Sequence, residues 1–250
     1  MIRKKFKNYE DLTKVVINKD KIDIISAQNV LAHNSYPLEF LEQCRDIMRD
    51  DSVLFIQTSQ ANMVKNNEFD TIYHEHLSFF NANSMNELAK RAGLYLTGVN
   101  KTPIHGNSYV FVFRKQPHDG NLQAVLDQER EQGLQDMNTY LAYADRCYTI
   151  VEDLNDTIAH YRGLGYVIAG YGAAAKGMTL INYGDLYLDF IIDDNELKQG
   201  TYSPGMSIPI VPIEHLDTYQ PGDKILFIPL AWNYFDDIQK KILSKRMNPN

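Results

Sequence analysis

Residues 165–177 read Gly165-Tyr166-Val167-Ile168-Ala169-Gly170-Tyr171-Gly172-Ala173-Ala174-Ala175-Lys176-Gly177. This stretch indicates a buried strand, a glycine-rich turn and the start of a helix. The N–H groups at the start of such a helix, together with the helix dipole, can hold an anion. Lys176 adds a full positive charge at the same place. The stretch therefore predicts an α/β unit whose turn binds a phosphate or a nucleotide, unless the glycines only permit close packing of the helix on the sheet.

The residues that follow continue the α/β pattern. The helix is predicted to run to about Asn182 and to be followed by a strand over Leu188–Ile192. Further strands are predicted at Ile208–Val211 and Lys224–Pro229, with a last helix over Tyr234–Leu243. Strands that alternate with helices favour a parallel sheet.

The N-terminal part has a similar alternation. The predicted elements are, in order, a strand at Ile22–Ser26, a helix at Pro37–Met48, a strand at Val53–Gln57, a helix at Ser84–Ala92, and two strands at Leu94–Val99 and Ser108–Arg114. In parallel α/β units ligands bind beyond the carboxyl ends of the strands. Residues 26–36 and 57–80 are therefore predicted to lie at the ligand-facing edge.

A long helical pattern joins the two parts. It spans about Leu122–Tyr161 and is predicted to break at Gly133. We therefore predict three regions: a first α/β domain over residues 1–115, a helical linker over 116–163, and a second α/β domain over 164–250.

The composition indicates a folded protein of a reducing compartment. The 250 residues are 44% hydrophobic and 23% charged, and the net charge of -7 argues against binding of nucleic acid. Two cysteines can form neither a disulfide framework nor a four-cysteine zinc site. The sequence has neither an apolar run long enough to span a membrane nor a signal-peptide core. We therefore predict a cytoplasmic protein with no bound metal.

The run Tyr73-His74-Glu75-His76 concentrates groups that move protons. A histidine titrates near neutral pH, so it can act as a general base that a neighbouring carboxylate orients. The run is also compatible with ordinary surface residues or with a metal site. Spacing alone leaves these alternatives open.

The glycine-rich turn also fits a dinucleotide-binding motif. Ala175 can occupy the third position of that motif, and Asp193 or Asp194 lies about twenty residues further on, where a ribose hydroxyl would bind. An NAD-dependent oxidoreductase is therefore a lesser alternative.

Together, these segments resemble the sugar C-methyltransferase family, S-adenosylmethionine-dependent enzymes that methylate a carbon of a nucleotide-linked keto-deoxysugar. The resemblance runs from about residue 20 to residue 245. It is carried by Asn29–His33, Glu68–His76, His105–Ser108, Gly170–Gly177, Ile192–Asn195, Lys198–Gly200, Pro204-Gly205, Ile208–Ile210 and Ala231–Tyr234.

The resemblance implies a catalytic role for His76 as the base, with Glu75 and Tyr73 orienting it or bonding the keto oxygen. The carbon next to a ketone becomes nucleophilic when its proton is removed and the enolate charge is held. Further residues are expected to contact the nucleotide-sugar: His74, His105, Asn107, Gly172, Lys176, Asn195, Lys198, Asn233 and Tyr234. Asn107 stands where the family usually has a glycine. Trp232, the single tryptophan, is expected to anchor the core.

The implied fold is a partial class I methyltransferase sheet of the Rossmann type that ends in a strand pair, then a long linking helix and a second Rossmann-like α/β domain. The resemblance begins in the middle of the donor-binding domain. The family's cysteine-rich zinc segment and glycine-rich donor loop are thus expected to be absent, and Gln28, Asn29 and His33 are the remaining candidates for contact with S-adenosylmethionine.

An exposed first strand would invite pairing with another chain. The expected partners are therefore a nucleotide-diphosphate sugar and either a separate N-terminal donor-binding half or a second copy of the chain. Two alternatives to an active methyltransferase stay open: a non-catalytic nucleotide-sugar-binding remnant, and one subunit of a split enzyme.

Overall fold

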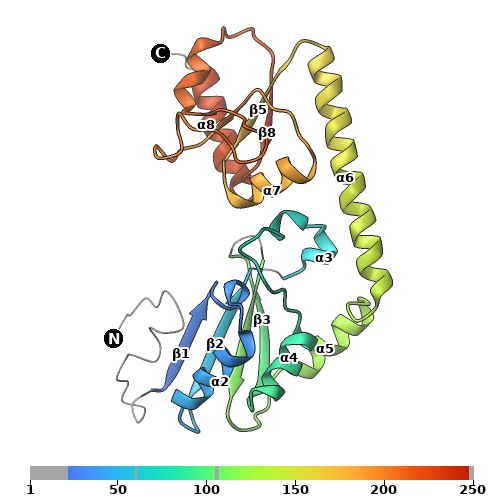
Figure 1. The fold of residues 1–250 in the computed structure, drawn as a ribbon, viewed down its shortest axis with the longest axis vertical. Coiled ribbons are helices and arrows are strands. Elements are labelled where there is room, and N and C mark those ends of the chain that lie inside the picture. Colours follow the sequence, from blue (N-terminus) through green and yellow to red (C-terminus); the bar gives the residue numbers. More distant parts are fainter. Residues whose placement is uncertain (1–21, 60, 105–106, 248–250) are drawn as a thin grey trace. The chain divides into compact units, whose positions relative to one another are not determined.

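The computed structural model describes residues 22–59, 61–104 and 107–247. The chain divides into two compact units (Figure 1). The first unit contains residues 1–62 and 74–139, and the second contains residues 63–73 and 140–250. A short segment from the early part of the chain thus belongs to the second unit. The domain borders at residues 115 and 163 stay a prediction.

The first unit contains a mixed four-stranded sheet. Its strands are β1 (Ile24–Gln28), β2 (Val53–Thr58), β3 (Tyr95–Thr102) and β4 (Ser108–Arg114), in the spatial order β1-β2-β4-β3. β1 and β2 run parallel, whereas β4 is antiparallel to both β2 and β3. The predicted α/β sheet that ends in a strand pair is confirmed, because the parallel pair β1–β2 continues into the antiparallel pair of β4 and β3.

Three helices and a short 3₁₀ helix surround this sheet: α2 (Pro37–Ile47), α4 (Ala82–Arg91), α5 (Leu122–Glu131) and η2 (Leu31–His33). α2 begins with Pro37, as predicted, because proline fits the first helical position. α4 begins two residues before the prediction, since the Asn81 side chain accepts a hydrogen bond from the Ser84 N–H and caps the helix.

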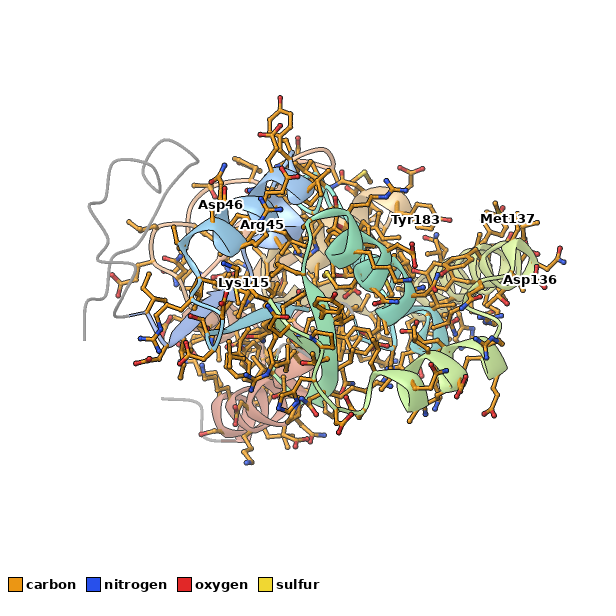
Figure 2. All side chains as sticks on the ribbon, turned by 90° about the horizontal axis from the view of Figure 1, so that it is seen from below. Arg45, Asp46, Lys115, Asp136, Met137 and Tyr183 are labelled. Carbon is orange, nitrogen blue, oxygen red and sulfur yellow. The ribbon has the colours of Figure 1, made fainter. Side chains whose placement is uncertain are left out.

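The core of the first unit lies between the helices and the sheet. Large side chains from both layers are fully buried there, among them Leu41, Leu54, Ile56, Met85 and Phe111. Arg45, labelled with Asp46 on α2 in Figure 2, donates a 2.7 Å hydrogen bond to the Ala92 carbonyl at the end of α4. This bond ties the two helices together.

The second unit contains a wholly parallel sheet. Its strands are β5 (Val167–Tyr171), β6 (Phe190–Ile192), β7 (Ile210–Val211) and β8 (Ile225–Pro229), in the order β7-β6-β5-β8. The apolar run before the glycine-rich turn forms β5, which lies inside the sheet and is nearly all buried. The predicted second α/β unit is confirmed.

The helical elements of the second unit are α3 (Met63–Asn66), η3 (Phe69–Thr71), α6 (Met137–Gly163, whose first three residues belong to the first unit), α7 (Ala175–Tyr183), η4 (Ile213–Thr218), η5 (Trp232–Tyr234) and α8 (Phe235–Met247). α6 is one long uninterrupted helix (Figure 1). The break expected at Gly133 separates α5 from α6, with Gly133 at a φ of 69°. In the described part of the chain, no helix has the length and apolarity to cross a bilayer.

Candidate functional site

In the first unit, His76 is the buried member of the Tyr73-His74-Glu75-His76 run. It is 8% exposed, and the centroid of its ring lies 4.8 Å from that of His33. The ring of Phe79 meets it edge-on at 6.1 Å. His33 ends η2, which follows β1, so the two imidazoles lie at the carboxyl end of the parallel strand pair, the edge predicted to face ligand.

The segment that carries His76 is fixed to η2 by its backbone. Nδ1 of His33 lies 2.8 Å from the carbonyl oxygen of Glu75, and the N–H groups of Leu77 and Ser78 both donate to the Ala32 carbonyl at 2.8 and 3.2 Å. A carbonyl oxygen only accepts, so Nδ1 of His33 must carry the hydrogen. Its Nε2 is therefore left as the acceptor when the ring is neutral.

The other members of the run lie in more open positions. The side chains of His74 and Glu75 are 90% and 64% exposed, with His74 Nε2 and Glu75 Oε1 4.0 Å apart. Tyr73 is half-buried and is the last residue of the segment assigned to the second unit. The roles given to Tyr73, His74 and Glu75 stay predictions.

Unpaired polar atoms gather where β1 and β2 end. Within the described residues, Oδ1 of Asn29, Nε2 of Gln57 and Oγ1 of Thr58 are buried without a hydrogen-bond partner. Gln28 pairs with Gln57 in the sheet, and Asn29 donates a 3.1 Å backbone bond to the Gln57 carbonyl, so these residues are neighbours. Buried polar groups are normally hydrogen-bonded, and this edge therefore fits a polar ligand.

The turn before β4 is only partly described. His105 lies outside the described residues. Asn107 is half-buried, and its carbonyl accepts a 3.2 Å hydrogen bond from the Ala61 N–H. Contact of either residue with a sugar stays a prediction.

In the second unit, the glycine-rich turn is built around Asp193. This carboxylate is 8% exposed and accepts bonds from the Ala173 N–H at 2.6 Å and the Asn195 N–H at 2.8 Å. The amine of Lys198 donates to the Ala173 carbonyl at 2.7 Å. Gly172 has a φ of 96° and donates its own N–H to Ile192 at 2.7 Å. The Gly172 amide and the Lys198 amine are thus engaged within the protein.

The next carboxylate is also engaged. Asp194 accepts a 2.8 Å bond from the hydroxyl of Tyr171 and a 2.5 Å bond from the amine of Lys241. Although partial burial opposes its ionisation, these two hydrogen bonds lower the pKa of Asp194. Because Asp193 and Asp194 are both bonded to their own chain, this geometry does not favour the ribose-binding role that the NAD alternative requires.

Lys176, in the first turn of α7, lies over an aromatic ring. Its Nζ is 4.7 Å from the centroid of Trp232, a distance typical of a cation–π contact. The expectation that Trp232 anchors the core is wrong, because the residue is 37% exposed and its Nε1 donates a 2.6 Å hydrogen bond to Oδ2 of Asp70. Asn233 and Tyr234 follow it in η5 and are exposed.

The comparison with protein families identifies the chain. Residues 103–248 match the family described as the C-methyltransferase C-terminal domain. The chain belongs to the C-methyltransferase family. Residues 2–99 match a methyltransferase domain, so the predicted fold class is confirmed together with the family.

The chain is also similar to individual known proteins. C-methyltransferase NovU from Streptomyces niveus is 30% identical over 223 residues, which are 86% of this chain and 52% of NovU. The chain thus spans about half the length of this curated relative. Among solved structures, the LepI complex with SAM is similar at 19% identity and a TM-score of 0.31, over 38% of this chain and 26% of LepI. TnmH is similar at 20% identity and 0.30, over 38% and 30%.

Sequence reasoning missed three polar residues of these two units. Gln57 and Thr58 end β2 at the edge predicted to face ligand, and that position is the signal that could have singled them out. Asp70 lies inside the Glu68–His76 segment, but no local pattern relates it to Trp232, 162 residues away. Among the residues that the structure describes, no group of three or more His, Cys, Asp or Glu side chains could hold a metal ion.

Proposed function

We propose that this C-methyltransferase transfers a methyl group from S-adenosylmethionine to a carbon next to the ketone of a nucleotide-linked deoxysugar. The observation that carries the proposal is the contact between the buried His76 ring and His33 at the carboxyl edge of the first sheet. His76 is the proposed base that removes the proton from the sugar carbon. The name of NovU and the matched family support methyl transfer to carbon.

The surroundings of His76 suit this task. A positioned base contributes about a hundred- to ten-thousand-fold to the rate of proton removal. His33 is oriented by its bond to the Glu75 carbonyl, and it lies against one side of the His76 ring. His33 thereby restricts the orientations of the His76 ring. A base that acts on one particular carbon of a sugar requires such a fixed orientation.

The polar edge at the ends of β1 and β2 fits the methyl donor. S-adenosylmethionine supplies an electrophilic methyl group when it is bound. The residues proposed to hold it here are Gln28, Asn29 and His33, and the unpaired atoms of Gln57 and Thr58 extend the same edge. These five side chains offer both donors and acceptors to the polar parts of the donor.

The second unit is proposed to bind the diphosphate of the nucleotide-sugar. The first N–H groups of α7 have no partners within the helix, and Lys176 adds a positive charge beside them. Gly172 contributes through its left-handed backbone, which opens the turn, rather than through its N–H. Asn195, Lys198, Asn233 and Tyr234 stay proposed contacts of the nucleotide-sugar.

The proposed proton removal can be tested without the methyl donor. The chain is incubated in D2O with a thymidine-diphosphate 4-keto-6-deoxysugar, and mass spectrometry and NMR follow deuterium entry at the carbons next to the ketone. We expect exchange above the uncatalysed rate that is lost in His76→Asn. His74→Asn is the matched control, because its side chain is 90% exposed, and it should retain the exchange.

The same experiment separates the alternatives. If the sugar binds in a calorimeter but exchange equals the uncatalysed rate in the unaltered chain, the chain is the non-catalytic remnant. If exchange occurs but methylation with added S-adenosylmethionine requires a separately supplied polypeptide, the chain is one part of a split enzyme.

A further inference from the structure

Two buried atoms of opposite charge lie against the same indole in the second unit. Nζ of Lys176 lies over the ring of Trp232, and the Trp232 Nε1 bonds Oδ2 of Asp70. Lys176 Nζ and Asp70 Oδ1 are both buried, and within the described residues neither has a hydrogen-bond partner. No hydrogen bond therefore joins these two atoms to each other in the described part of the chain.

Such atoms require an explanation. Burial of an ionised group is unfavourable unless a partner replaces the lost water, and the cation–π contact replaces it only in part for Lys176. Asp70 is 7% exposed, and only one of its two oxygens is bonded. Unpaired buried polar groups of this kind are typical of sites that a ligand completes.

The backbone segment that carries Asp70 is held in place by contacts of its neighbours. It lies in η3, next to Phe69, whose ring is 5.2 Å from that of Tyr183 at the end of α7. Upstream in the same segment, Asn67 accepts a 2.9 Å bond from Arg146 on α6. The backbone that carries Asp70 is therefore ordered before a ligand binds. This order lowers the entropic cost of forming a hydrogen bond to the unpaired oxygen of Asp70.

From this geometry we infer that Asp70 determines ligand specificity: its Oδ1 accepts a hydrogen bond from a hydroxyl or N–H of the same ligand whose anionic oxygen is bound by Lys176. The inference rests on the proposed function for the identity of the ligand as a nucleoside-diphosphate sugar. It adds Asp70, and the pairing of Asp70 with Lys176, to the proposed site.

The pairing selects a class of ligand. An ammonium group has only donors and a carboxylate has only acceptors, so a ligand that satisfies both must carry an acceptor and a donor. Inorganic diphosphate satisfies Lys176 but is repelled by Asp70. A neutral sugar satisfies Asp70 but leaves Lys176 unpaired. A sugar joined to a diphosphate satisfies both.

Trp232 provides a direct readout, because it is the only tryptophan of the chain. Its fluorescence is followed while inorganic diphosphate, thymidine diphosphate or a thymidine-diphosphate deoxysugar is added to the unaltered chain, to Lys176→Met and to Asp70→Asn. The matched control is Lys224→Met, because Lys224 also lies over an aromatic ring, that of Tyr166 at 5.5 Å, in the same unit. Circular dichroism and melting temperature monitor folding of each variant.

The two substitutions should have different effects. A hydrogen bond to a charged group corresponds to about ten- to a hundredfold in affinity. Lys176→Met should weaken binding of all three ligands by about tenfold or more. Asp70→Asn should weaken binding of the nucleotide-sugar by about tenfold and leave inorganic diphosphate unchanged or bound more tightly. Lys224→Met should bind all ligands as the unaltered chain does.

The inference is wrong if folded Asp70→Asn binds the nucleotide-sugar as tightly as the unaltered chain, because Asp70 then only holds Trp232. If Asp70→Asn does not fold, the unaltered chain decides: equal affinities for inorganic diphosphate and the nucleotide-sugar would overturn the inference, and a preference of tenfold or more for the sugar would support it. Deuterium exchange tests the proposed function separately. If the unaltered chain shows no deuterium exchange but the variants bind the three ligands as predicted, only the catalytic proposal is contradicted.

Discussion

Glu129 caps a helix to which it does not belong. From α5 its Oε1 accepts the N–H of Ala82 at 2.6 Å and its Oε2 accepts the N–H of Asn83 at 3.0 Å, at the start of α4. The residue is 2% exposed. Because α4 begins six residues after His76, this carboxylate fixes the end of the segment that carries the proposed base.

Glu129 should make the stability depend on pH. Burial raises the pKa of Glu129, although the two N–H groups, Lys101 and Tyr109 oppose that shift. The folded state thus holds the Glu129 proton more tightly than the unfolded state does. The resulting contribution to the free energy of unfolding is fully present at acidic pH and is lost as the pH rises through the raised pKa. Urea unfolding of the unaltered chain and Glu129→Gln across pH 4 to 8 should show a flatter profile for the variant. Parallel profiles would contradict the raised pKa.

Removal of the Glu129 carboxylate should lower the free energy of unfolding more than its neutralisation does. In Glu129→Ala the N–H groups of Ala82 and Asn83 lose their acceptors, and we expect a loss of about 1 to 3 kcal/mol in the free energy of unfolding at any pH. Glu87→Ala is the control, because Glu87 is a half-exposed residue of α4 that forms a surface ion pair with Lys90, and it should change stability by less than about 0.5 kcal/mol. Equal losses in the two variants would contradict the capping role.

His33→Ala should loosen the segment that carries His76. The substitution removes the bond between Nδ1 and the Glu75 carbonyl, and we expect a loss of about 1 kcal/mol in the free energy of unfolding. It should also shift the NMR signals of His76, because the neighbouring ring is lost. His74→Ala should alter neither, since its side chain is 90% exposed. Unshifted His76 signals in folded His33→Ala would show that the two rings are not in contact.

Gly172→Ala should destabilise the second unit. A methyl group at this position would lie 2.5 Å from Cβ of Ala231, and its φ of 96° disfavours any side chain. We expect a loss of about 1 to 3 kcal/mol. In the matched variant Gly163→Ala the new methyl group would meet no atom within 4 Å at the end of α6, so stability should be unchanged or higher by up to about 1 kcal/mol. Thermal and urea unfolding measure both, and a neutral Gly172→Ala would contradict the geometry of the turn.

The two thiols should be unreactive in the folded protein. Burial raises the pKa of Cys44 to about 12, and it also raises the pKa of Cys147, although Tyr143 and Arg146 oppose the second shift. Because the thiolate is the reactive form, a thiol reagent at pH 8 should label neither cysteine until the protein unfolds. Titration with a chromogenic disulfide in increasing urea should show both thiols appearing with the unfolding transition. A thiol that reacts at once in native buffer would contradict this burial.

Local sequence signals predicted most of the secondary structure. Pro37 indicated the start of α2, Gly133 indicated the break between α5 and α6, and the apolar run before Gly170 indicated β5. These signals act through the backbone of a few adjacent residues, so they operate whatever the rest of the chain does. α4 begins two residues before the predicted start because the side chain of Asn81 caps it, a bond that the residue type alone does not specify.

The motifs also indicated which residue types are available for chemistry, but not their surroundings. The run Tyr73-His74-Glu75-His76 contains two similar imidazoles, and only the fold distinguishes buried His76 from exposed His74. The hydrogen bonds that Lys198 and Asp193 form with the glycine-rich turn likewise could not be predicted from the sequence, because their partner Ala173 lies 25 and 20 residues away along the chain. Burial and pairing depend on which elements meet, and spacing along the chain does not specify that.

By itself the sequence determined two α/β units, a long helical segment that separates their strands along the chain, and a motif suited to proton transfer. Only the tertiary structure decided that residues 63–73 belong to the second unit and that Asp70 bonds Trp232. The reason is physical: helices and strands follow from interactions between near neighbours, whereas a hydrogen bond across 162 residues forms only after both elements have folded and packed.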